Sequence, residues 1–133
     1  MTFKNAFLLI GAVLLAHGIG LFFGLYEFWT WYDVPLHIGG GFVMGALGLA
    51  IWNEGISGVV FKSSLKKHLE FWLVPLFVIS FVALISVLWE LHEFLLDVFY
   101  SAVIRQPGIQ DTMSDFFNDL AGGLLAIGIF YRK

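Results

Sequence analysis

The stretch Phe71–Leu96 reads FWLVPLFVISFVALISVLWELHEFLL, and its first 19 residues, up to Trp89, carry no charged side chain. A helix of that length spans about 28 Å at 1.5 Å per residue. The hydrocarbon core of a bilayer is about 30 Å thick and needs roughly 20 apolar residues to cross it. The stretch is therefore predicted to be a transmembrane helix that carries Glu90 and Glu93 near its far end.

Three further segments of the 133-residue chain are long and apolar enough to span a membrane. The four predicted spans run from about 6–25, 34–52, 71–96 and 112–131. The chain is 59% hydrophobic and only 13% charged, against roughly 25% charged residues in soluble domains. We therefore predict an all-α polytopic membrane protein, a four-transmembrane-helix bundle that forms a single domain over residues 1–133. Because the chain has no Cys, thiolate catalysis and Cys-ligated metals are excluded.

The basic residues predict the orientation of the bundle. Six of the seven Lys and Arg residues flank the predicted spans on one side of the membrane: Lys4, Lys62, Lys66, Lys67, Arg132 and Lys133. Only Arg105 lies on the other side. By the positive-inside rule, we expect a multi-pass protein of the cell (inner) membrane with both termini in the cytoplasm.

The acidic residues gather on the opposite, extracytoplasmic side. Only Glu54 and Glu70 of the ten acidic residues lie on the cytoplasmic side. The other eight are Glu27, Asp33, Glu90, Glu93, Asp97, Asp111, Asp115 and Asp119. Ionisable residues within a membrane are costly and rare, so a cluster of them is a functional-site hypothesis.

Asp119 is the acidic residue that the thickness of the membrane forces inside. The 12 residues Leu120–Tyr131 span only about 18 Å as a helix, which is too short to cross the hydrocarbon core. The last helix must therefore extend back through Asp119 and Asp115. The depth of Glu90 and Glu93 stays open, because the residues before them already span the core.

Helical spacing groups the polar residues into three stripes, since residues three or four apart share a helix face. The stripes are Asp33 with His37, then Glu90 with Glu93 and Asp97, and finally Asp111 with Asp115 and Asn118, beside which lies Asp119. In a compact bundle these three helix ends are expected to converge. The small-residue spacing Gly41-x3-Gly45 predicts a close helix–helix contact that supports such convergence.

Structural explanations compete at several of these positions. Asp33 before Pro35 is typical of a helix N-cap, and Thr112–Asp115 fits a capping box. Acidic residues in a first helical turn are also favoured by the helix dipole, although Asp119 lies too far along for that. Glu27 is interpreted as an interfacial surface charge. His17, in the middle of the first span, is interpreted as an interhelical hydrogen-bonding group.

The cluster is predicted to bind a divalent metal. The predicted ligands are His37, Glu90, Glu93, Asp115 and Asp119, with Asp33, Asp111 and Asn118 as supporting polar residues. Carboxylates with His and without Cys suit Zn²⁺, Mn²⁺ or Fe²⁺, and carboxylates with water suit Mg²⁺. Glu90 and Glu93 are candidates for a catalytic general base. Shared protons, or water together with Arg105, are the alternatives to a metal.

These residues also resemble a known family. The pattern Tyr32-Asp33-x3-His37-x2-Gly40, then Glu90-x2-Glu93, then Asp111-Thr112-x2-Asp115-x2-Asn118-x3-Gly122, is similar to that of the YjdF-like family of small multi-helix inner-membrane proteins. The resemblance covers roughly residues 31–127. It implies a multi-helix membrane fold and no particular activity. Members of that family are longer, with additional N-terminal helices.

Three functions remain open from the sequence. The first is a metal-dependent site that acts on a lipid headgroup or other amphiphile, with membrane lipids as partners and no nucleic acid. The second is a component of cation or proton transport, for which His17 is the only additional mid-membrane candidate. The third is a structural or assembly role, in which the cluster only stabilises the bundle. A homo-oligomer is also left open.

Overall fold

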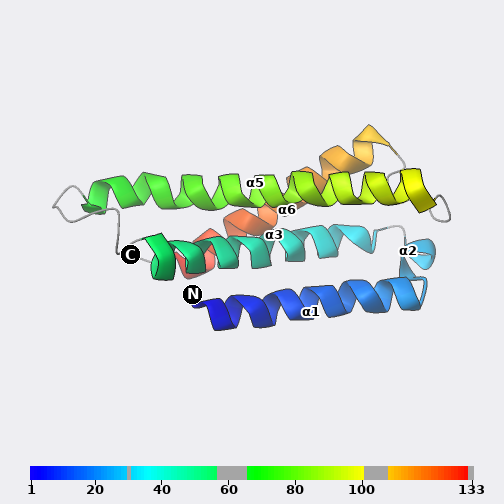
Figure 1. Ribbon diagram of the computed structural model, residues 1–133, viewed down its shortest axis with the longest axis horizontal. Helices are drawn as coiled ribbons and strands as arrows, with labels where there is room; N and C mark the ends of the chain where they lie inside the picture. Colours follow the sequence, from blue (N-terminus) through cyan, green and yellow to red (C-terminus); the bar gives the residue numbers. More distant parts are fainter. Residues whose placement is uncertain (30, 57–65, 101–107, 132–133) are drawn as a thin grey trace.

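The computed structural model describes the whole chain except residues 30, 57–65, 101–107 and 132–133 (Figure 1). The described elements are α1 (Phe3–Phe22), α2 (Leu25–Phe28), α3 (Asp33–Ala50), the π-helical turn η1 (Ile51–Ile56), α5 (Lys66–Tyr100) and α6 (Ile109–Phe130). No strand occurs among these described residues. Four stretches are long and apolar enough to cross a membrane, namely Phe3–Phe22, Asp33–Ile56, Glu70–Phe99 and Ile109–Phe130. The prediction of an all-α protein with four membrane-spanning helices is therefore confirmed.

The first helix begins and ends earlier than the sequence predicted. Thr2 is its N-cap, and the Thr2 hydroxyl accepts a hydrogen bond from the backbone N–H of Asn5 at 3.4 Å. The helix ends at Phe22, shortly before Gly24, whose φ of 65° lies in the left-handed region. Glycine adopts that conformation without the steric penalty of a Cβ atom, so it allows the chain to turn into α2.

The third predicted span is much longer in the structure. Helix α5 has 35 residues, which corresponds to about 52 Å, so it exceeds the hydrocarbon core and its ends must project beyond it. The last helix also starts earlier than predicted, at Ile109 with Gly108 as its N-cap. Several of the basic residues that predict the orientation lie outside the described residues: Lys62, Arg105, Arg132 and Lys133.

The polar ends of three helices meet at one end of the bundle. Figure 1 shows the start of α1 and the end of α6 at one end of the long axis. The start of α3, the end of α5 and the start of α6 lie together at the opposite end (Figure 1). The acidic stripes occupy those three helix ends, so the topology brings them to one end of the bundle.

Helix α3 is the centre of the bundle, and its closest partner is α6. An added Cβ atom at Gly41 would collide with the backbone of Asp119, and one at Gly122 would collide with the carbonyl of Ile38. Further along the same seam, a Cβ atom at Gly45 would lie 2.8 Å from Cβ of Ala126. The predicted small-residue contact at Gly41-x3-Gly45 is thus confirmed, and it joins α3 to α6 by direct backbone packing.

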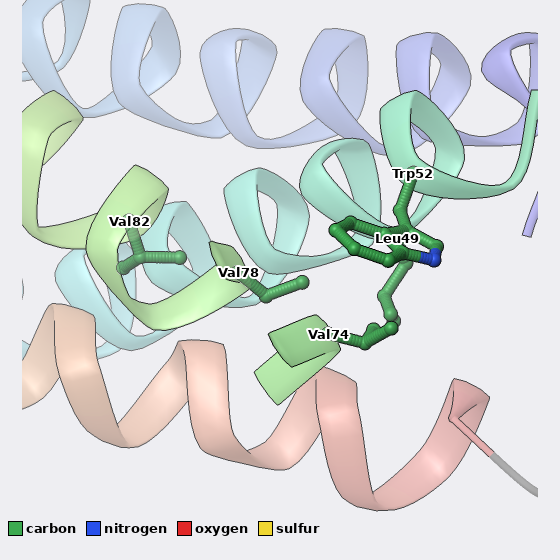
Figure 2. Close-up of a cluster of buried hydrophobic side chains, with 5 residues drawn as sticks. All are labelled: Leu49, Trp52, Val74, Val78 and Val82. Atoms are coloured by element: carbon green, nitrogen blue, oxygen red, sulfur yellow. The ribbon is translucent and has the colours of Figure 1, made fainter. Parts of the chain in front are cut away.

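The end of the bundle away from the acidic stripes is held by an apolar core. Figure 2 shows Leu49 and Trp52 of the α3–η1 segment facing three valines of α5. The valines are Val74, Val78 and Val82, each no more than 1% exposed. These side chains fix α5 against α3 and set the position from which α5 continues toward the polar end.

Helix α1 is the most loosely held of the four spans. Only Ala6 and Gly20 are buried in it, and apolar side chains such as Leu8 and Leu15 are about two-thirds exposed, at 65% and 66%. In a membrane these side chains contact lipid, where exposure of an apolar surface costs little. Helix α1 packs mainly against α3.

We expect Gly41→Ala to destabilise the protein strongly, since the new methyl group meets the backbone of Asp119, which cannot rotate away as a side chain can. Overpacking of this kind costs about 1–3 kcal/mol or more. Thermal unfolding in detergent would measure the loss. Gly11→Ala in α1 is the matched control, because nothing lies within 4 Å of its added Cβ atom. Equal melting temperatures for the two variants would contradict the described α3–α6 contact.

Candidate functional site

The first two turns of α3 supply two polar groups of the site, Asp33 and His37. The helix begins at Asp33, its N-cap is Tyr32, and no side chain caps it. The interpretation of Asp33 as an N-cap is therefore wrong, because Asp33 already lies within the helix. One turn later, Nε2 of His37 lies 3.5 Å from Oδ2 of Asp33. Pro35 fits between them because the first helical turn needs no backbone N–H there.

His37 is buried where α3 meets α6, and both of its ring nitrogens face carboxylates. Nδ1 lies 3.3 Å from Oδ1 of Asp119, while Nε2 lies 3.8 Å from Oδ1 of Asp115. His37 is only 5% exposed. The two carboxylates are one turn apart on α6, so a single face of that helix covers both edges of the imidazole ring.

The start of α6 explains why Asp115 belongs to this cluster. The helix begins at Ile109, so Asp111 lies in its first turn and Asp115 lies well beyond it. The capping-box interpretation of Thr112–Asp115 is therefore wrong, and the helix dipole explains only Asp111. Asp115 and Asp119 are buried instead, at 3% and 6% exposure. Their burial follows from the glycine seam that brings α6 onto α3.

Helix α5 adds a third stripe, which begins one turn earlier than predicted. The hydroxyl of Ser86 donates a hydrogen bond to Oδ2 of Asp119. Glu90 and Glu93 follow on the same face and are 4% and 8% exposed. Nε1 of Trp89 donates to Oε1 of Glu93 at 3.1 Å. Ser86 and Trp89 were missed, although the spacing Ser86-x3-Glu90-x2-Glu93 already continues the acidic stripe backward.

The remaining predicted polar residues divide between the edge of the cluster and the surface. Glu93 lies within electrostatic range of Asp33, Glu90 and His37, so the stripe of α5 faces the cluster. Glu27 and His92 are exposed, and Asp97 and Asp111 are partly buried. The amide of Asn118 donates to Ser114 of its own helix at 3.4 Å, which is a contact on the outside of the bundle.

A second histidine joins α1 to the rim of the cluster. Nδ1 of His17 lies 2.6 Å from the hydroxyl of Tyr26 in α2, and its ring packs edge-on against Trp89 of α5 at 5.5 Å between centroids. Burial, with a smaller contribution from Asp33, raises the pKa of the Tyr26 phenol, so the hydroxyl stays protonated. The predicted hydrogen-bonding role of His17 is confirmed, with α2 as its partner element.

A cavity of about 110 Å³ adjoins the cluster between α1, α3 and α5. Asp33, His37, Ser86 and Asp119 line it from the polar side. Its remaining lining is largely apolar. The cluster is also reachable from the end of the bundle, since the Asp33 side chain is 28% exposed. The site thus combines a buried polar group of residues with an adjacent apolar space.

One trio of residues could hold a metal ion. Asp33, His37 and Asp115 each offer a ligand atom, and these atoms lie within 4.8 Å of one another. Among the described residues this is the only such group of three or more. Of the predicted ligands, His37 and Asp115 belong to it, while Asp119 contacts the other nitrogen of His37. Asp33, predicted only as a supporting residue, completes the trio.

The fold and site define a four-span membrane protein with a buried His–carboxylate cluster at one end. Residues 3–133 match the family described as "Predicted membrane protein (DUF2238)", and the chain belongs to that family. The predicted membership in a family of small multi-helix membrane proteins of unknown function is therefore confirmed.

One relative is an uncharacterized protein of Thermotoga maritima, 31% identical over 136 residues. The match covers 98% of this chain and 63% of the relative, so the chain spans less than two-thirds of that protein's length. No solved structure matches the chain.

Proposed function

We propose that this integral membrane protein holds a divalent metal in its His–carboxylate cluster and uses it to act on a lipid headgroup or another amphiphile. The observation that carries the proposal is the trio Asp33, His37 and Asp115, whose ligand atoms lie within 4.8 Å of one another. Three ligands with further positions open to water or substrate are typical of catalytic metal sites.

The partners of His37 support this proposal. A metal-binding histidine usually donates its other ring N–H to a carboxylate, which fixes the orientation of the ring. Nε2 of His37 faces the trio, while Nδ1 faces Asp119. Asp119 is held in turn by the hydroxyl of Ser86. In this arrangement Asp119 is a positioning residue that acts through His37, rather than a ligand itself.

Electrostatics also favours a bound cation. Carboxylates from α3, α5 and α6 lie together within a membrane-spanning bundle, where unpaired negative charge is unfavourable. A divalent ion would compensate two of these charges at once. The ligand set of one His and two carboxylates suits Zn²⁺, Mn²⁺ or Fe²⁺, and Mg²⁺ with additional water. The metal would polarise a substrate oxygen or activate water, with Glu90 or Glu93 as general base.

Transport is the weaker alternative. The polar contacts continue inward from His37 through Asp119 to Ser86. Beyond Ser86, the described part of α5 that faces the bundle interior is the valine stripe Val74, Val78 and Val82 of the apolar core. A proton or cation pathway through one copy of the chain would need polar groups or water there.

We further propose that the cluster faces the extracytoplasmic side, with both termini in the cytoplasm. The distribution of Lys and Arg supports this orientation.

The orientation is testable because the chain has no native Cys. Glu27→Cys, at the end of the bundle that carries the cluster, is expected to react with a membrane-impermeant maleimide in intact cells. Glu54→Cys, near the other end, is expected to react only after the membrane is permeabilised. Both residues are exposed, so a difference in their reaction with the reagent reports the side of the membrane on which each lies. The reverse labelling pattern would overturn the proposed orientation.

Elemental analysis of the purified protein tests the metal site. We expect about one divalent ion per chain, lost in Asp115→Ala, and an affinity reduced roughly 10–100-fold in Asp119→Ala, as for other residues that orient a metal-binding His. Asn118→Ala is the matched control on the same helix, because Asn118 contacts only the outer Ser114 in the described hydrogen bonds.

The same measurement separates the alternatives. A metal-free wild-type protein, after exposure to each candidate ion, would contradict the proposal and favour shared protons among the carboxylates. Stoichiometric metal whose removal only unfolds the bundle would favour the structural role.

A further inference from the structure

The cavity beside the cluster has features that the metal site alone does not require. It measures about 110 Å³ and lies between α1, α3 and α5. Helix α1 packs against α3 but makes few backbone contacts with α5. The contact between the rings of His17 and Trp89 bridges these two helices near the cluster. On the side of that contact away from the acidic end of the bundle, the cavity lies between α1 and α5 and is lined by α3 as well.

The lining of this cavity changes from polar to apolar with distance from the cluster. On each helix the lining residue toward the acidic end of the bundle carries a polar group, and the lining residue at the other extreme is apolar. The pairs are Asp33 and Met44 on α3, His17 and Ile10 on α1, and Trp89 and Val82 on α5. Along α3 this change extends over 11 residues, or about 16 Å. The same gradient on three helices matches an amphiphile whose polar end lies at the cluster.

The cavity also reaches the lipid-facing surface. Leu14 lines it, yet 54% of Leu14 is exposed. The side chains that line an empty cavity lack dispersion contacts on the side that faces it. An apolar cavity that opens to a bilayer can regain these contacts by taking up a hydrocarbon chain from the membrane. An engineered cavity of about 150 Å³ holds a benzene ring. The space of about 110 Å³ beside the cluster is smaller than that, so it admits a short apolar segment such as part of an acyl chain.

We infer that this cavity binds a segment of an acyl chain of a membrane phospholipid, with the headgroup of that lipid at the cluster. The inference rests on the proposed function, since it names the substrate class of the same site. The acyl chain would enter between α1 and α5 past Leu14 and extend toward Met44. The headgroup would then lie beside Asp33 and His37, where the cluster is open to the end of the bundle.

The test uses the full chain in nanodiscs that contain a phospholipid with a diazirine near the end of one unbranched acyl chain. Bulk lipid labels exposed positions, so the decisive positions are the buried lining residues Val43 and Val82, which are 3% and 1% exposed. We expect photolabelling of these residues in the wild-type protein. Labelling confined to exposed residues would overturn the inference, and so would stronger labelling of the buried pair by a methyl-branched polyisoprenyl phosphate probe.

Two variants that fill the cavity make the test specific. Val13→Trp and Ile10→Trp place a large side chain in the lining from α1, and labelling of the buried valines should fall several-fold. Leu15→Trp is the control on the same helix, because Leu15 is 66% exposed and lies outside the lining. Its labelling should match the wild type. Melting temperatures verify that the variants fold. If both filling variants unfold, the labelling of Val43 and Val82 in the wild-type protein still tests the inference.

The metal content of the same samples keeps the two proposals distinguishable. Photolabelling of Val43 and Val82 by the acyl-chain probe needs no metal, so it should persist in the presence of a chelator. Labelling of the buried valines without any bound metal would leave the acyl-chain site standing and remove the proposed metal chemistry. Bound metal with no labelling of Val43 or Val82 would overturn the acyl-chain inference alone.

Discussion

The backbones of α3 and α6 touch at Gly41 and Gly122, and the pairing of His37 with Asp115 and Asp119 depends on that contact. Without a Cβ atom at Gly41, the backbone of Asp119 can lie directly against α3. His37 is one turn from Gly41 on α3, so the same approach brings its ring between Asp115 and Asp119. A membrane supplies no hydrophobic force between helices, so close packing of small residues is what holds this seam together.

A cluster of this kind is costly, which makes its arrangement informative. His37, Asp115 and Asp119 are all buried, and each has a partner among the described contacts. Ser86 adds a neutral donor to Asp119 from a third helix. Replacement of such buried charged residues by well-packed apolar ones is often neutral or stabilising, so stability alone does not explain them. Their presence at one end, beside a cavity of graded polarity, supports a function in binding and chemistry at the membrane surface.

Much of the fold was predictable because the bilayer constrains it. Apolar length identified four spans, and membrane thickness alone required Asp119 to lie inside. The capping interpretations failed at Asp33 and Asp115 because cap motifs are local and do not define where a helix begins. Helix α6 starts at Ile109, and the helical position of each later residue follows from that start. The pairing of His37 with Asp119 depends on the register of two helices, which spacing within one helix cannot reveal. Ser86 was overlooked because the hydroxyl of a single serine in an apolar helix usually donates a hydrogen bond to a backbone carbonyl of its own helix.

The most direct test of the account is anomalous X-ray diffraction from crystals of the protein grown with Zn²⁺ or Mn²⁺. We predict one anomalous peak between Asp33, His37 and Asp115. The ion would lie roughly 2.0–2.2 Å from Nε2 of His37, while Nδ1 of the same ring contacts Asp119. No peak at that position, with the imidazole of His37 in direct contact with the carboxylates, would contradict it.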